Sequence, residues 1–260
     1  MAARPAGLCS VTFRDRSVEQ VAALAADAGL AVVEWGGDTH VPPGDDRAAV
    51  AASRASAEAG LGVVSYGSYL VCDDGAASRL GAVLDTTEAL GAPAVRVWCP
   101  FGATDRREVV DAAAEIAAAA DRRGLVVYLE FHGGTLTDSA ASAAAVLDDV
   151  GATNLFVAWQ PPYWAEPSTV DDRADLRALG PRLAHLHVYE WDRDLSRHPL
   201  ARGAAAWPAR LTVAAAATSA FPGAAALLEF VADDDPANLV ADAAVLLGWL
   251  AEVDGGGRHG

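Results

Sequence analysis

The chain has 260 residues, 52% of them hydrophobic, and carries a formal net charge of −16. This length is typical of one eight-stranded α/β barrel, and the hydrophobic content argues against a disordered chain. Apart from histidines, all of the basic side chains are arginines. The acidic balance argues against a nucleic-acid partner, because an acidic surface repels phosphate backbones.

The three cysteines and the N-terminus favour an intracellular protein. Cys9, Cys72 and Cys99 are odd in number and widely spaced, so they fit neither a disulfide framework nor a zinc finger. The first seven residues lack the apolar stretch of a secretory signal. Every apolar run is interrupted by Gly, Asp, Glu or Arg, so we expect no membrane span. These features predict a cytoplasmic enzyme.

Eight short apolar segments have the character of buried parallel strands, because each is bounded by Gly, Pro, Asp or Asn. In chain order they are Leu8–Thr12, Ala31–Trp35, Gly62–Gly67, Ala94–Trp98, Leu125–Glu130, Leu155–Trp159, Leu183–Tyr189 and Ala226–Phe230.

Helical patterns alternate strictly with these strands. Ser17 and the pairs Thr104–Asp105 and Asp138–Ser139 are candidate N-caps, and glycines follow most of the helix bodies. The sequence therefore predicts an α/β protein with a single (β/α)₈ TIM barrel over residues 1–253 and a flexible tail at 254–260. The predicted helices are Ser17–Ala28, Asp46–Ala59, Ala76–Leu90, Asp105–Arg123, Ser139–Val150, Val170–Leu179, Pro208–Ala217 and Pro236–Val253.

Two of the predicted strands end in a carboxylate although the rest of each strand is apolar. These residues are Glu130 and Glu229. The carboxyl ends of barrel strands converge on one site, where an unpaired buried carboxylate is costly. One interpretation pairs each Glu with an arginine from a neighbouring loop. The other joins both carboxylates with a histidine around one divalent ion, Mn²⁺, Mg²⁺, Co²⁺ or Zn²⁺.

The seventh predicted strand supplies two histidines on one face, because strand side chains alternate. His187 lies nearer the carboxyl end than His185 and is the better candidate ligand. A hydrogen-bonded core role is the alternative for either histidine.

Three short motifs stand at predicted strand ends: Leu129-Glu130-Phe131-His132-Gly133, His185-Leu186-His187-Val188 and Leu228-Glu229-Phe230. Together with the loop Glu34–Pro42, they resemble the xylose-isomerase-like TIM barrel superfamily, in particular the sugar phosphate isomerase/epimerase family. The resemblance covers nearly the whole barrel. It implies four metal ligands of the types Glu, Asp, His and Glu.

The same resemblance implies a metal-dependent isomerase or epimerase acting on a sugar or keto-polyol. A divalent ion would bind the substrate's carbonyl oxygen and neighbouring hydroxyl, stabilising an enediolate. Glu130 and Glu229 would act as the acid/base pair, one removing the proton and the other returning it.

One position departs from the family pattern. The sixth strand ends in Gln160 where the family has Asp. An amide oxygen still binds a hard cation but adds no negative charge. Gln160 is therefore either a weaker fourth ligand or free to bind substrate.

Further candidates for substrate binding lie at strand ends and on the loops that follow. For each of them, ordinary packing or a solvated surface is the alternative. They are Glu34, Trp35, His40, Tyr66, Trp98, His132, Trp159, His185 and Arg202.

Other functions remain open at this stage. The same enolate chemistry followed by loss of a leaving group would give a lyase or dehydratase on a keto-inositol or keto-glycoside. A non-catalytic binding barrel is a third possibility, whereas the acidic charge argues against DNA repair. The resemblance also leaves open a homodimer or homotetramer.

Overall fold

The eight strands close into a parallel barrel in the order β1-β2-β3-β4-β5-β6-β7-β8, with β8 pairing β1. The computed structural model describes residues 4–103, 105–217 and 219–256. This architecture confirms the predicted (β/α)₈ barrel. The strands are β1 Ala6–Cys9, β2 Val32–Gly36, β3 Gly62–Val71, β4 Ala94–Trp98, β5 Val126–Leu129, β6 Leu155–Trp159, β7 Leu183–Val188 and β8 Ala226–Leu228.

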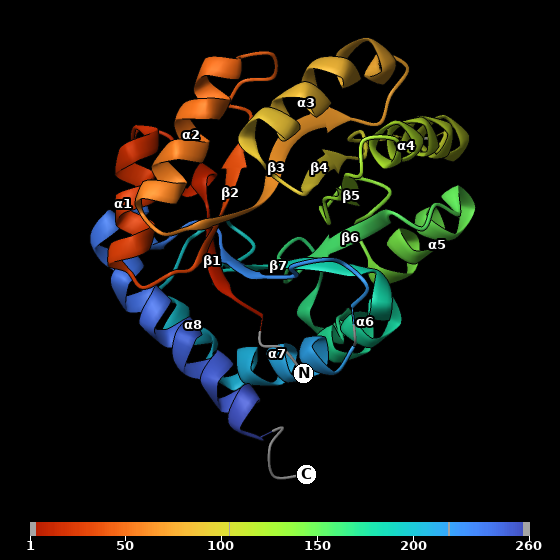
Figure 1. The fold of residues 1–260 in the computed structure, drawn as a ribbon. Helices are drawn as coiled ribbons and strands as arrows, with labels where there is room; N and C mark the ends of the chain where they lie inside the picture. The colour runs from red at the N-terminus through yellow and green to blue at the C-terminus, as the bar shows by residue number, and fades with distance from the viewer. Residues whose placement is uncertain (1–3, 104, 218, 257–260) are drawn as a thin grey trace.

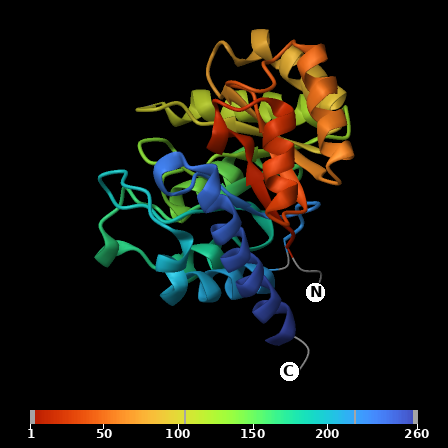
Figure 2. The same ribbon diagram turned by 90° about the vertical axis from the view of Figure 1, so that its left-hand side faces the viewer.

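Eight α-helices form a ring around the strands, and α8 closes the ring between α7 and α1 (Figures 1 and 2). The predicted caps are present: the side chains of Ser17, Asp105 and Ser139 each accept a hydrogen bond from a backbone N–H in the first helical turn. The helices are α1 Val18–Asp27, α2 Asp46–Glu58, α3 Ala76–Leu90, α4 Arg106–Asp121, α5 Ala140–Val150, α6 Asp172–Leu179, α7 Trp207–Ala216 and α8 Pro236–Gly256.

The largest differences from the predicted element boundaries occur in β1, β3 and α8. Strand β1 ends at Cys9, because the chain turns into the 3₁₀ helix Ser10–Phe13. Strand β3 continues to Val71, and its pairing with β4 shifts between Gly67 and Leu70. Helix α8 continues through Gly256, so of the predicted tail only 257–260 lie outside the described residues.

Helix α8 also corrects the expectation that no segment is apolar enough to cross a membrane. By length and composition alone, Pro236–Gly255 meets that requirement. This is weak support for a span, because the helix packs on α7, α1 and β1 as an outer barrel helix does. Its buried Asp242 accepts a hydrogen bond from the Leu200 backbone at 2.8 Å, which ties α8 to the 3₁₀ helix Leu200–Ala205.

Most of the core is apolar and fills the space between the sheet and the helices. A smaller set of buried polar side chains instead belongs to the strands or to the residues directly after them. This set includes Glu34, Ser65, Arg96, Glu130, Gln160, His185, His187 and Glu229. Because several of these residues come from different strands, the fold gathers their charges at one place.

Candidate functional site

Four of the predicted site residues stand at the carboxyl ends of consecutive strands. Glu130, Gln160 and Glu229 directly follow β5, β6 and β8, and His187 is the penultimate residue of β7. Each of these side chains is at most 8% exposed. The backbone N–H groups of Glu130 and Glu229 donate to Val97 and Val188 of the neighbouring strands, which fixes where the side chains start.

Arg96 on β4 forms ion pairs with three carboxylates. Its Nη2 lies 2.9 Å from Glu34 Oε1, and its Nη1 lies 2.8 Å from Glu130 Oε2 and 3.8 Å from Glu229 Oε1. Gly67 on β3 makes room for this guanidinium, because a Cβ at that position would lie 2.8 Å from Arg96 Nη2. A buried cation of this kind reduces the repulsion between the carboxylates around it.

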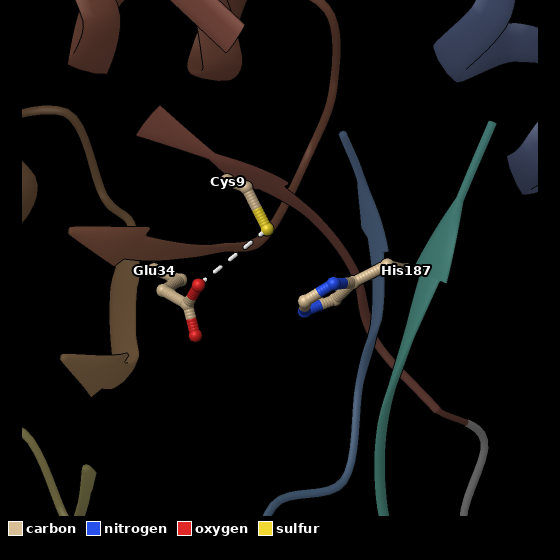
Figure 3. Close-up of side chains that lie close together, drawn as sticks. All are labelled: Cys9, Glu34 and His187. Atoms are coloured by element: carbon tan, nitrogen blue, oxygen red, sulfur yellow. Dashed lines mark hydrogen bonds between the residues drawn. The ribbon is translucent and has the colours of Figure 1, made fainter. Parts of the chain in front are cut away.

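Glu34 has its hydrogen-bonding capacity filled. Besides the contact of Oε1 with Arg96, Oε2 accepts from Ser65 Oγ at 2.6 Å and from the Tyr128 hydroxyl. Cys9 Sγ also donates to Oε1 at 3.7 Å, as Figure 3 shows. Although Cys9, Glu34 and His187 come close enough together to suggest a metal site, an ion would have to displace these bonds. Burial, followed by the Glu34 charge, also raises the Cys9 pKa, which opposes the thiolate that metals bind.

Glu130 and Glu229 differ from Glu34 because each turns an oxygen toward an unsatisfied group. His187 Nδ1 lies 3.6 Å from Glu130 Oε1 and 3.3 Å from Glu229 Oε2. Within the described residues, neither ring nitrogen of His187 has a hydrogen-bond partner, although both are buried. Such an orphaned pair of nitrogens is rare unless the site serves a further group.

The charges around His187 shift the pKa values of both His187 and Glu130. Burial alone would lower the pKa of His187, but Glu229 and Glu130 raise it to about 10. Burial alone would raise the pKa of Glu130, but Arg96 and His187 lower it to about 2. Glu130 is therefore ionised at neutral pH, and it faces a position that favours positive charge.

This arrangement fits a divalent cation. Glu130, Glu229 and His187 offer two carboxylate oxygens and an imidazole nitrogen, which suit Mn²⁺, Mg²⁺, Co²⁺ or Zn²⁺. The orphaned nitrogens of His187 are the observation that supports the fit. Gln160 donates from Nε2 to the Phe131 carbonyl at 2.5 Å, so its amide is oriented within the same group.

A cavity of about 200 Å³, here called the barrel-mouth cavity, lies over the carboxylates. Two of the residues that line it have backbones in the left-handed region: Tyr69 with φ 56° and Phe230 with φ 65°. Such backbone strain in non-glycine residues is concentrated at functional sites. The cavity is lined by Arg14, Tyr69, Trp98, Glu130, His132, Gln160, Tyr163, Tyr189, Trp191, Glu229 and Phe230.

Two of the predicted substrate-binding residues line this cavity. Trp98 packs against His132 with ring centroids 5.1 Å apart. His132 Nε2 lies 3.3 Å from the Tyr163 hydroxyl, and its Nδ1 lies 2.9 Å from the Gly133 carbonyl oxygen. Glu34 lies below them in the Arg96 network and does not line the cavity.

Several other predicted residues are held elsewhere by identifiable partners. Trp35 donates to Ser56 on α2 at 2.9 Å, and the Tyr66 hydroxyl donates to the Val41 carbonyl at 2.7 Å. Trp159 packs on Trp207 of α7.

The remaining predicted residues also lie outside the barrel-mouth cavity. His40 contacts Ser10 Oγ at 3.0 Å, and His185 Nδ1 accepts from the Ala225 backbone at 3.0 Å. Burial, followed by the charge of His187, lowers the pKa of His185, so it is neutral. Arg202 is exposed and pairs with Asp192 at 2.9 Å.

Arg96 and most of the aromatic residues that line the barrel-mouth cavity were not predicted from the sequence. Arg96 is the one charged residue of β4, between Val95 and Val97, and that isolation in an apolar strand was the available signal. Tyr163, Tyr189 and Trp191 lie in connections, where an aromatic ring has no periodic pattern to reveal its direction.

The comparisons with known proteins agree with this fold. The family model described as "Xylose isomerase-like TIM barrel" matches residues 22–252. A search of curated proteins finds no match.

Solved structures of the same fold cover almost the whole chain. A probable 3-DHS dehydratase from Bacillus anthracis has a TM-score of 0.79 at 17% identity, covering 94% of this chain and 98% of its own. D-Psicose 3-epimerase with D-tagatose, from Clostridium cellulolyticum H10, has a TM-score of 0.76 at 15% identity, covering 96% and 99%. A xylose isomerase-like TIM barrel protein from Mycobacterium smegmatis in complex with magnesium has 0.73 at 12%, covering 97% and 99%.

Proposed function

Because the chain belongs to the xylose isomerase-like TIM barrel family, we propose that it is a divalent-metal-dependent isomerase or epimerase. Its substrate would be a sugar or keto-polyol. The observation that carries the proposal is the pair Glu130 and Glu229, each of which lines the barrel-mouth cavity and turns an oxygen toward the orphaned His187. Epimerases among the solved structures of this fold support the same reaction class.

In the proposed mechanism the two carboxylates transfer a proton at a carbon next to the substrate carbonyl. Glu130 is held ionised by Arg96 and can accept the proton. Glu229 lies farther from Arg96, at 3.8 Å, and would return a proton from its own side. For this step to balance, Glu229 carries the proton that it gives to the carbon, and Glu130 keeps the proton that it removes. Transfer through an enediolate in this way inverts the carbon or moves the carbonyl.

The acid/base pair and the residues around it would also hold the metal ion and the substrate. Glu130, Glu229 and His187 would bind the divalent ion, with the amide oxygen of Gln160 as the fourth ligand. When bound, this ion supplies a Lewis acid that stabilises negative charge on the substrate oxygen. Trp98 and Tyr69, which stack with ring centroids 5.8 Å apart, form a wall that excludes water from the reacting carbon.

A lyase is the second candidate, because the cavity contains a possible acid for a leaving group. The Tyr163 hydroxyl lies 3.3 Å from His132 Nε2, and both side chains line the barrel-mouth cavity. A proton relayed through this pair could assist the departure of a hydroxyl or alkoxyl group from the same enolate. The proposal in either form is of a cytoplasmic enzyme acting on a small carbohydrate-like molecule.

The test combines elemental analysis with deuterium exchange. We expect close to one Mn, Co, Zn or Mg per chain in the wild type, and loss of the metal in Glu130→Gln and His187→Ala. Wild-type protein should exchange the C3 or C1 hydrogen of ketoses in D₂O, whereas Glu130→Gln should not. Glu115→Gln, an exposed substitution on α4, is the matched control and should behave as wild type. Protein that neither retains nor rebinds metal would overturn the proposal.

A further inference from the structure

A second cavity of about 290 Å³, here called the side cavity, lies next to the barrel-mouth cavity. It is formed by the connection after β6, the connection after β7, and the starts of α6 and α7. The two cavities share Tyr163, Tyr189 and Trp191 as lining residues. The rings of Tyr163 and Trp191 pack 5.0 Å apart, and those of Tyr189 and Trp191 pack 4.9 Å apart. The two cavities are therefore adjacent, and these three aromatic residues line both of them.

The sizes of the two cavities suggest that they serve one ligand. Small-molecule sites usually span roughly 300–1,000 Å³. The barrel-mouth cavity is below that range at about 200 Å³, but together with the side cavity's 290 Å³ it falls inside it. A free monosaccharide over the carboxylates would leave the larger of the two spaces unused.

The side cavity has a fixed polar wall. Arg210 on α7 lies 2.5 Å from Asp172 Oδ2 and 3.8 Å from Glu190 Oε1. Glu190 Oε1 also accepts from Trp207 Nε1 at 2.9 Å, a contact possible only because Gly203 has no side chain. Asp172 Oδ1 is buried without a hydrogen-bond partner within the described residues. Carboxylate oxygens held in place next to a guanidinium offer both acceptors and donors to hydroxyl groups.

The side cavity also has apolar lining residues. Pro161, Pro162 and Val170 line it together with the shared aromatic residues. Aromatic and proline surfaces pack against the C–H faces of a sugar ring, while polar groups at the edge bind its hydroxyls. The combination of apolar surface and polar groups at its edge is suited to binding a hydroxylated ring.

We propose that the side cavity is a subsite for a second hydroxylated ring, so that the substrate is a glycoside or disaccharide rather than a free monosaccharide. Its keto-sugar unit lies over Glu130 and Glu229, and its second ring lies against Arg210, Asp172 and Glu190. This inference rests on the proposed function and specifies its substrate class. If the second ring is attached through the leaving oxygen, the reaction becomes the lyase form described above.

The test compares the binding of D-fructose with that of two disaccharides that carry a ketose unit, turanose and isomaltulose, by calorimetry on the metal-loaded protein. We expect at least one disaccharide to bind about tenfold more tightly than fructose. Ala165→Trp places an indole in the side cavity without touching the barrel-mouth cavity, and it should abolish this advantage while fructose affinity stays within about twofold.

Two further variants keep the result interpretable. Val170→Trp fills the side cavity from another position and should repeat the effect of Ala165→Trp, in case one of these proteins does not fold. Ala174→Trp, on the exposed surface of α6 and outside both cavities, is the matched control and should change neither affinity. Disaccharides that bind no more tightly than fructose, or blocking variants that weaken both ligands equally, would overturn the subsite. Deuterium exchange on fructose would then still support the proposed function, so the two failures are distinguishable.

Discussion

Glu34 and the pair Glu130 and Glu229 are buried carboxylates in the same barrel, yet their surroundings differ. Glu34 accepts hydrogen bonds from Ser65 and Tyr128 and pairs with Arg96. Glu130 and Glu229 also approach Arg96, but each turns its other oxygen toward His187, whose ring nitrogens have no hydrogen-bond partner in the described part of the chain. Burial alone therefore does not distinguish the proposed acid/base pair from a carboxylate in a satisfied network. An incompletely satisfied carboxylate beside a cavity is a better indicator.

The largest expected effect tests this contrast through activity. Glu229→Gln should lower the rate of ketose proton exchange by about 10²–10⁴-fold, because it removes one of two acid/base groups. Glu34→Gln should lower stability by about 1–3 kcal/mol, because it disturbs a satisfied buried network, and it should lower the exchange rate less. Exchange in D₂O and urea unfolding measure the two effects. Equal losses of activity in both variants would remove the distinction.

Arg96 is common to both groups, so its removal should affect both. Arg96→Met should destabilise the protein by about 3–5 kcal/mol, because it leaves buried carboxylates without their cation. Urea unfolding with and without added Mn²⁺ would measure this loss. Added metal should recover part of the stability, because it compensates Glu130 and Glu229 but does not reach Glu34. Full stability in the metal-free variant would show that the carboxylates do not depend on Arg96.

A substitution at Gln160 tests whether this residue belongs to the metal-binding group. Gln160→Asp adds the negative charge that the family resemblance implies at the end of β6, so we expect metal to bind about tenfold more tightly. Competition with a chelator gives the dissociation constant. Gln160→Glu is a useful control, because the same charge on a longer side chain tests whether position matters as well. An unchanged affinity in Gln160→Asp would place residue 160 outside the ligand set.

The pH dependence of the metal-free protein tests the charges of the metal-facing group directly. The folded-state pKa of Glu130 is lowered from 4.5 to about 2, so its contribution to stability is present above pH 4.5 and is lost as the pH falls toward 2. The pKa of His187 is raised from 6.5 to about 10, so its contribution is present below pH 6.5 and is lost as the pH rises toward 10. Urea unfolding in EDTA should show both slopes.

Two variants assign these slopes. Glu130→Gln should flatten the acid limb, and His187→Gln should flatten the alkaline limb. An unchanged acid limb in Glu130→Gln would assign that slope to other carboxylates of this acidic chain.

The barrel and four residues of the site were predictable because they follow from local patterns. Strict strand–helix alternation gave the topology. Strand ends in a barrel meet at one site, and this rule gathers Glu130, Gln160, His187 and Glu229 whatever the details of packing.

The sequence analysis was less informative about side chains adjacent to those ends. Strand side chains alternate, so the chain neighbour of an inward residue points outward. Glu34 faces the Arg96 network, and Trp35 beside it donates to Ser56 on α2. Trp159 likewise packs on Trp207 of α7. Applying the alternation rule to Trp35 would have separated it from the substrate-binding candidates.

Arg96 could not be assigned a role from the sequence because its partners are far away along the chain. An arginine between two valines is compatible with a surface strand as well as with a buried ion pair. Its contacts with Glu34, Glu130 and Glu229 exist only once β2, β5 and β8 lie around it. Local sequence patterns contain no information on such distant pairs. The interpretation of the glutamates as arginine-paired expected a partner from a neighbouring loop, whereas Arg96 lies on strand β4.

The position of Arg96 also has a consequence for how the chain folds. The last strand, β8, completes the barrel by pairing β1, and the same step brings Glu229 to the guanidinium. Partial barrels that lack the C-terminal strand would expose the edges of β1 and β7 and leave the charge network incomplete. Closure between strands so far apart along the chain is expected to slow folding. The Arg96 network therefore reaches its final arrangement only after β8 has been synthesised and has paired with β1.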